Sequence, residues 1–272
     1  MQITQEPEFL EPTSNYVGKI GRFVIASIRQ AGRAGLLFLY SLLYLKNILN
    51  KRARREILGQ MYISGIKSIG VISVVAVFTG MILALQTGIE LRKFNQETFI
   101  GSAVMISMLR EMGPFMTGLI LAACVGSSMA AQLGTMVVSE EIAALEVMSI
   151  NPIRFLVMPR LVAMCIMTPL LSFYTCILGV VGGGVVGFTQ LGVKWAAYID
   201  NATRYAEVKD LYVGLFKAFV FGILITIISC HEGFATTKGA VGVGMATRRS
   251  VISAFLFILI TGYFITRLFY YE

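Results

Sequence analysis

Long uncharged apolar runs dominate the chain from about residue 65 to its end. A helix rises about 1.5 Å per residue, so about 20 apolar residues are enough to cross the hydrocarbon core of a bilayer. The runs that reach or approach this length lie at residues 68–89, 99–138, 161–193, 211–230 and 251–266. The pattern therefore predicts an all-α integral membrane protein with about five transmembrane helices, in one membrane domain over residues 61–272.

Two of these runs are longer than a simple span requires. The second is interrupted only by Arg110 and Glu111 and contains Gly113-Pro114, where we expect a broken or re-entrant helix, since proline has no backbone N–H. The third contains no charge and fits either one long tilted span or a span followed by a re-entrant turn at Gly182–Gly184. Between these two runs, residues 139–154 are polar with helical periodicity and predict a short amphipathic helix outside the membrane.

The region before the first span has a different character. Residues 1–14 are polar and we expect them to be disordered, whereas residues 15–60 alternate basic with apolar side chains. Such a basic amphipathic segment is typical of a helix that lies in the membrane interface, and the alternative is a basic solubilising tail. Because no positive segment leads into an apolar stretch at the start, we expect no cleaved signal peptide.

Composition and charge agree with a membrane protein. Only 14% of residues are charged, against about a quarter in soluble proteins. The net charge of +8 comes from basic residues beside apolar segments, without interleaved aromatics, so we expect no nucleic-acid partner. Lys and Arg are more numerous on the side that contains the N-terminus, which predicts a cytoplasmic N-terminus.

Catalytic and nucleotide-binding patterns do not occur in the sequence. His231 is the single histidine and is expected in a loop, and the four cysteines lack the spacing of metal ligands. No G-x-x-x-x-G-K-S/T loop is present. We therefore expect a chain that is not an enzyme and holds no metal, so that a separate subunit would bind any nucleotide.

Three ionisable residues lie within the apolar runs, namely Arg110, Glu111 and Lys217. Such residues are costly in a membrane and are candidates for function. Adjacent helical residues point in different directions, so we expect Arg110 and Glu111 to reach different partners. Alternatively they cap a broken helix near Pro114, and Lys217, near the end of its run, snorkels to the head groups.

Small residues recur at helical spacing in two runs. Gly179, Gly183 and Gly187 share one helix face, and a second small face extends from Gly126 to Gly134. Small faces allow helix backbones to approach closely. We therefore expect compact helix packing, and such faces also favour oligomers.

Two segments carry a resemblance to a known family. The stretch REMGPFMTGLILAACVGSSMAAQLGTMVVSEEIAALEVMSINPIRFLVMPR and the later GVGMATRRSVI resemble the MlaE permeases of phospholipid ABC transporters, over roughly residues 15–270. The resemblance implies a homodimer in the bacterial inner membrane, with an interfacial N-terminal helix, five spans and a cytoplasmic coupling helix. It also implies three protein partners: an ABC ATPase that binds ATP and Mg, an MCE-domain lipid carrier outside and, in some systems, a STAS-domain protein.

The resemblance also assigns roles to residues of this chain. The coupling helix that would dock on the ATPase corresponds to Ser139, Glu140, Glu141, Leu145, Glu146 and Met148. The lipid cavity would be lined by Arg110, Glu111 and Phe94. To these we add Lys217, because its charge would suit a phosphate head group, and Met81 and Leu85, chosen from their place on the first span.

Four positions depart from the family's usual residues. Cys124 and Val137 replace arginines, Gln132 replaces a glutamate and Glu141 replaces a glutamine. Losing both an arginine and a glutamate is expected if the two normally pair, because one charge left alone in a low-dielectric site costs roughly 3–5 kcal/mol.

Two other classes of function stay open on sequence alone. In the first, Glu111 and Lys217 form the proton or ion path of a secondary transporter or channel, although we find no internal repeat of spans. The second is a purely scaffolding role.

Overall fold

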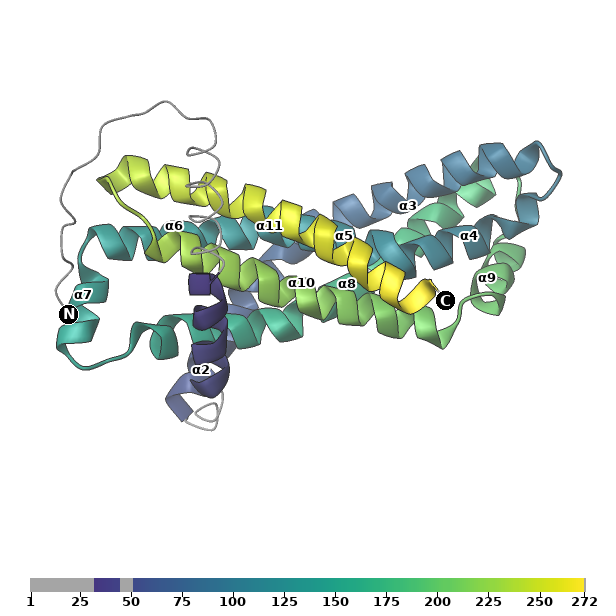
Figure 1. Ribbon diagram of the computed structural model, residues 1–272. Helices are drawn as coiled ribbons and strands as arrows, with labels where there is room; N and C mark the ends of the chain where they lie inside the picture. The colour runs from purple at the N-terminus through teal and green to yellow at the C-terminus, as the bar shows by residue number, and fades with distance from the viewer. Residues whose placement is uncertain (1–31, 45–50, 272) are drawn as a thin grey trace, which may run out of the picture.

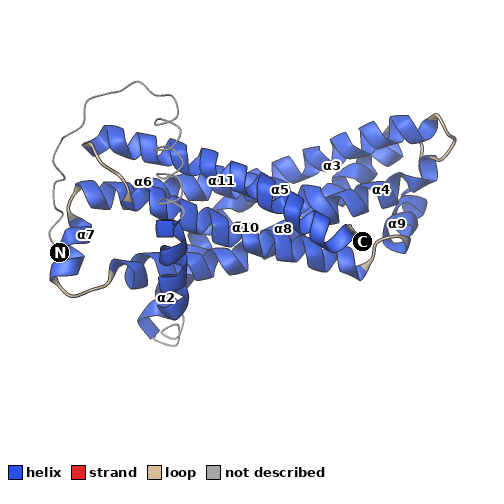
Figure 2. Ribbon diagram, viewed as in Figure 1, coloured by secondary structure: helices blue, strands red, loops and turns tan. Residues whose placement is uncertain are grey.

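The computed structural model describes residues 32–44 and 51–271, apart from the side chains of residues 51 and 52. Within that part every regular element is a helix (Figure 2). An isolated helix spans Gly32–Leu43. The elements that follow are α2 (Lys51–Ser64), α3 (Ile69–Arg92), α4 (Ile100–Ser107), α5 (Gly113–Leu121), α6 (Ser127–Val138), α7 (Glu141–Val147), α8 (Met158–Thr189), α9 (Trp195–Arg204), α10 (Val208–Phe234) and α11 (Gly239–Tyr270).

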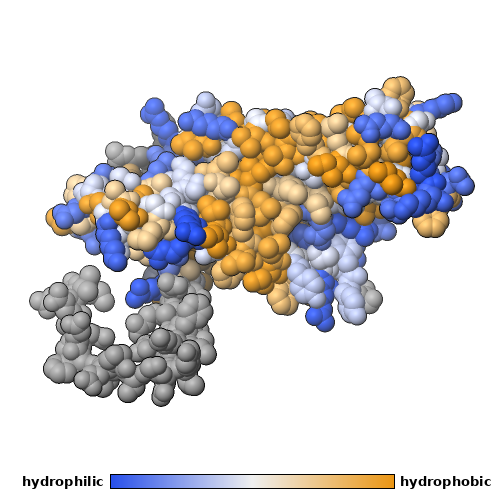
Figure 3. Space-filling view, turned by 90° about the horizontal axis from the view of Figure 1, so that it is seen from above, coloured by the Kyte–Doolittle hydropathy of each residue, from blue (hydrophilic) through white to orange (hydrophobic). Residues whose placement is uncertain are grey.

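Five helical runs in the described part are long and apolar enough to cross a membrane, as predicted. They cover Ala53–Arg92, Glu97–Val138, Ile153–Thr189, Val208–Phe234 and Gly239–Tyr270. In Figure 1 the long helices lie roughly along one common axis. Helix α7 is at one end of the bundle and α9 at the other, while α2 lies across the long helices. An apolar band lies between two polar ends (Figure 3). The chain is therefore a multi-pass membrane protein.

The expected break near Gly113-Pro114 is wrong, because helix continues from Glu97 to Val138. Two wider π turns interrupt it, Met108–Met112 (η4) and Ala122–Gly126 (η5). Proline cannot donate to the carbonyl four residues before it. Here η4 ends directly before Gly113, and Pro114 occupies the first turn of α5, so the local widening accommodates the proline without breaking the span.

Of the two alternatives for the third run, the single long span is the one observed, since α8 continues through Gly182–Gly184 without a re-entrant turn. The glycines instead allow close packing. A Cβ on Gly80 would collide with the backbone of Gly179, and a Cβ on Gly182 would meet the carbonyl of Val77. The predicted small face of α8 therefore lets α3 approach to backbone contact.

The stretches between the last three predicted spans, residues 194–210 and 231–250, contain more helix than the apolar runs indicate. Residues 195–204 form α9, His231 lies in the last turn of α10 rather than in a loop, and α11 begins at Gly239. Tyr198 of α9 is buried and donates to the carbonyl of Val180 at 3.0 Å. Burial raises the pKa of this phenol, which therefore keeps the proton that it donates.

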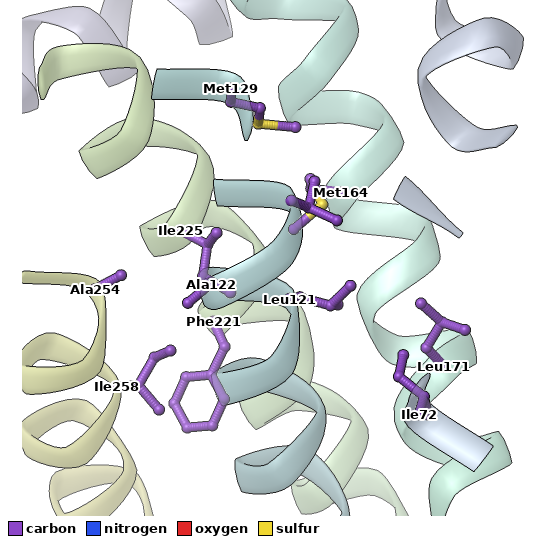
Figure 4. Packing of buried hydrophobic residues seen from close by; sticks show 11 residues of the cluster. Ile72, Leu121, Ala122, Met129, Met164, Leu171, Phe221, Ile225, Ala254 and Ile258 are labelled. Carbon is purple, nitrogen blue, oxygen red and sulfur yellow. The ribbon is translucent and has the colours of Figure 1, made fainter. Parts of the chain in front are cut away.

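The largest apolar core joins all five spans, and Ile72 of α3 is the member from the first. Figure 4 shows Phe221 and Ile225 of α10 beside Ile258 of α11 and Leu121 of α5. Polar side chains also bond between helices in this interior, where Thr117 lies 2.8 Å from Thr175. Close packing and such hydrogen bonds hold helices together in a membrane, where lipid removes the hydrophobic drive for them to associate.

Candidate functional site: two ion pairs within the helix bundle

The π turn η4 brings Arg110 to an acidic partner at the start of α10. Its Nε donates to Oδ1 of Asp210 at 2.6 Å, and its Nη2 donates to Oδ2 at 3.2 Å. The Tyr270 hydroxyl donates to the same Oδ1 at 2.8 Å, and the guanidinium lies 4.6 Å from the Tyr270 ring centroid. Bidentate pairing and the cation–π contact fix the plane of the guanidinium.

The next residue, Glu111, pairs with a different helix position. Lys217 Nζ donates to Glu111 Oε1 at 2.6 Å and to the Thr266 hydroxyl at 2.7 Å, and that hydroxyl lies 2.6 Å from Glu111 Oε1. Lys217 also donates to the carbonyl of Arg110 at 2.8 Å. This is the carbonyl to which Pro114, four residues on, cannot donate. The ammonium thus binds both a carboxylate and a backbone group at the π turn.

Each pair combines one buried and one half-exposed side chain. Asp210 is 0% and Lys217 is 1% exposed, whereas Arg110 is 36% and Glu111 is 41% exposed. The buried members face the bundle and are neutralised by their partners. The half-exposed members leave one positive and one negative group accessible at the surface of the bundle.

The prediction that Arg110 and Glu111 reach different partners is confirmed. The snorkelling alternative for Lys217 is wrong, because its ammonium is held inside the bundle. Sequence reasoning missed Asp210, Thr266 and Tyr270, and it placed Asp210 in a loop. The available signal was the spacing of Asp210 and Lys217, because residues seven apart on a helix share one face.

The other predicted cavity residues lie apart from the ion pairs. Phe94 follows the end of α3 and is strongly exposed, and Leu85 is exposed on α3. Met81 is half-buried and packs against the apolar cluster around Met108. Their assignment to a lipid cavity stays a prediction.

The predicted amphipathic helix outside the membrane corresponds to α7, which lies at one end of the bundle in Figure 1. It buries none of its residues in this chain, and Val147, at its end, is 85% exposed. Ser139 donates to the carboxylate of Glu141 at 3.0 Å. The six predicted coupling residues therefore lie on or beside one projecting helix, and their role stays a prediction.

Gln132, which replaces the family's usual glutamate, bonds to an arginine on a neighbouring helix. Its Oε1 accepts from Nη2 of Arg160 at 3.1 Å, and Arg160 is almost fully buried. Cys124, by contrast, is exposed. The arginine that faces Gln132 is therefore Arg160, on α8, rather than a residue at position 124.

Comparison with known proteins identifies the family. Residues 57–268 match the family model described as permease MlaE. The chain belongs to the MlaE permease family. A probable ABC transporter permease protein of Rickettsia prowazekii is 39% identical over 90% of this chain and 95% of its own length.

Two further relatives come from a bacterium and a plant. The intermembrane phospholipid transport system permease protein MlaE of Haemophilus influenzae is 32% identical over 90% of this chain and 94% of its own length. The chloroplastic protein TRIGALACTOSYLDIACYLGLYCEROL 1 of Arabidopsis thaliana is 32% identical over 79% of this chain and 62% of its own length.

Proposed function

We propose that two copies of this chain form the permease of an ABC transporter that moves phospholipids between the bacterial inner membrane and an MCE-type carrier outside. The name of the Haemophilus relative supports phospholipid as the substrate class. The observation that carries the proposal is the pair of half-exposed opposite charges, Arg110 and Glu111, on an apolar bundle. A phospholipid has the complementary character, because it joins a charged head group to apolar chains.

The geometry suggests how the ion pairs would serve a lipid. Arginine binds phosphate oxygens well, and a carboxylate attracts an ammonium group. Because Asp210 and Lys217 hold their partners from the buried side, Arg110 and Glu111 keep their orientation while one face of each stays open. A head group that arrives at this face would therefore bind side chains that are already oriented. It would not have to remove the hydration shell of mobile, unpaired charges.

Energy would enter at the opposite end of the bundle. An ABC ATPase that binds ATP and Mg would dock on α7, whose exposed residues and acidic Glu141 and Glu146 give it a contact surface. In this proposal α7 lies in the cytoplasm, on the side predicted for the N-terminus, and the ion pairs lie towards the outer face. A STAS-domain protein would join the ATPase in systems that contain one.

The proton-path alternative receives no support from the geometry. It required Glu111 and Lys217 to exchange ions with water, whereas these two residues bond each other at 2.6 Å. Lys217 also has two further acceptors within 2.8 Å.

Photo-crosslinking tests the proposed lipid contact. Ser107 lies about one helical turn before Arg110 and Glu111 and is half-buried, so a photoreactive residue there keeps both ion pairs. We expect it to capture radiolabelled phospholipid from vesicles that contain the assembled transporter, with a yield that changes when ATP is added. The same residue at Val147 in α7 is the control and should capture little lipid. Equal capture at the two positions would refute the contact.

A further inference from the structure

An apolar pocket lies between the spans, beside the pair of Arg110 and Asp210. Its volume is about 430 Å³. Met105 and Leu109 of the second span, Ile177 and Val180 of α8, and Leu211 of α10 contribute apolar side chains to its walls. Pockets of about 300–1,000 Å³ with mainly apolar walls are typical of small-molecule sites.

The pocket opens towards the part of the surface that faces lipid. Phe173, Ile177 and Val181 line it, are exposed, and follow one another at four-residue spacing along α8. A row of this kind within a membrane-spanning helix is in contact with acyl chains rather than water. The molecules that reach the opening are therefore membrane lipids.

One end of the pocket has a negative charge. Among the described residues that line it, Glu207 is the charged one, and it directly precedes the span that begins at Val208. Its side chain caps α10 by accepting from the backbone N–H of Asp210. A carboxylate has about four acceptor positions, so Glu207 can cap the helix and still receive an ammonium group.

We propose that this pocket holds one acyl chain of a membrane phospholipid whose amine-bearing head group lies against Glu207. The chain occupies the apolar cleft between α8 and α10, and the carboxylate at the span end stands at head-group level. The inference does not depend on the direction or energy source of transport.

The bound chain also supports the ion-pair site from behind. Leu109 and Leu211 line the pocket, and the next residue to each, Arg110 and Asp210, forms the bidentate pair. A filled pocket therefore packs against both backbone segments that carry this pair. The lipid is expected to raise the thermal stability of the protein, because it binds the folded form.

Two tryptophan substitutions test whether the pocket is the lipid site. Ile177→Trp fills the pocket. Ile166→Trp is the control, because Ile166 lies three helical turns earlier on the same face of α8 and does not line the pocket. The two isoleucines are similarly exposed, Ile166 at 43% and Ile177 at 47%. We titrate the full-length proteins in detergent with an equimolar mixture of phosphatidylethanolamine and phosphatidylglycerol. Native mass spectrometry then measures how many molecules of each lipid remain bound. We expect Ile177→Trp to retain fewer phosphatidylethanolamine molecules than wild type, and Ile166→Trp to retain as many. Equal retention of phosphatidylethanolamine by the two variants overturns the proposal. So does a result in which Ile177→Trp changes the number of protein copies in the complex but leaves the amount of bound lipid unchanged.

A charge substitution tests the head-group contact independently of pocket filling. Glu207→Gln keeps an acceptor oxygen for the helix cap and removes the charge, and Glu90→Gln removes an exposed charge that does not line the pocket. We expect Glu207→Gln alone to lower the ratio of bound phosphatidylethanolamine to phosphatidylglycerol by about two- to fivefold, the range of an exposed ion pair. An unchanged ratio in Glu207→Gln overturns the proposed head-group contact.

Discussion

At the scale of single residues, the ion pairs are asymmetric, and the asymmetry determines how they respond to substitution. A charge stranded in the interior costs far more than one that water can reach. Lys217 and Asp210 are buried, while Glu111 and Arg110 are half-exposed. Removing a half-exposed member therefore strands a buried charge, and removing a buried member leaves a charge that can be hydrated.

This asymmetry gives a prediction for the pair of Glu111 and Lys217. Glu111→Leu should destabilise the protein by about 3–5 kcal/mol, as for a broken buried pair, because the Lys217 ammonium loses its counter-charge. Lys217→Met should cost less. The double variant should recover much of the loss of Glu111→Leu. Thermal unfolding in detergent measures all three, and a larger loss for Lys217→Met than for Glu111→Leu would contradict the asymmetry.

The same argument applies to the second pair. Arg110→Leu strands the fully buried carboxylate of Asp210, whereas Asp210→Asn keeps an acceptor for Tyr270 and leaves a half-exposed guanidinium. We expect Arg110→Leu to lower the unfolding temperature more than Asp210→Asn does. Equal shifts in the same thermal assay would show that burial does not govern the cost.

At the scale of elements, close backbone contact between α3 and α8 leads to a prediction. Gly80→Leu would place a side chain against the backbone of Gly179, and rigid backbone cannot move aside as a flexible side chain can. We expect the free energy of unfolding to fall by about 1–3 kcal/mol or more, the usual cost of overpacking, or the variant to fail to fold. Gly70→Leu is the matched control on the same helix, because nothing lies within 4 Å of its Cβ position. Equal yields of folded, monodisperse protein would contradict this packing.

The projecting helix α7 should respond in the opposite way, with a change in binding and none in stability. Val147→Asp alters a side chain that is 85% exposed, so the unfolding temperature should stay the same. Affinity for the partner ATPase should fall about tenfold or more, as for an apolar anchor at an interface. Val241→Asp, also strongly exposed at the start of α11, is the control. If Val147→Asp captures the ATPase as well as wild type does, α7 is not the surface on which the ATPase docks.

The apolar runs alone were enough to predict the five spans, because length and lack of charge suffice to identify a span. They were insufficient to predict that the helix continues past Pro114, because the carbonyl that the proline leaves unpaired, that of Arg110, accepts from Lys217, 107 positions away in sequence. Asp210 was missed for a similar reason. Its partner is 100 positions away, and its place near a span end is typical of a loop residue.

At the scale of the whole molecule, the half-exposed charges and α7 are separated along the length of the described bundle. The half-exposed charges lie near the start of α10 and the end of α11, and α7 projects from the other end of the bundle (Figure 1). A transporter driven by a partner ATPase needs a receiver of force and a substrate site that are joined by rigid helices. In the proposed function the second span would supply this link, since it runs without a break from Glu97, through Arg110, to Val138 beside α7.

The most direct test of this account is phospholipid transfer by the reconstituted complex. Vesicles that contain the permease with its ATPase and MCE carrier are loaded with a fluorescent phospholipid, and its movement between membrane and carrier is followed. We predict transfer that requires ATP and Mg, and that Val147→Asp abolishes while leaving the permease folded. Equal transfer by the permease chain alone, without ATPase or nucleotide, would contradict the account.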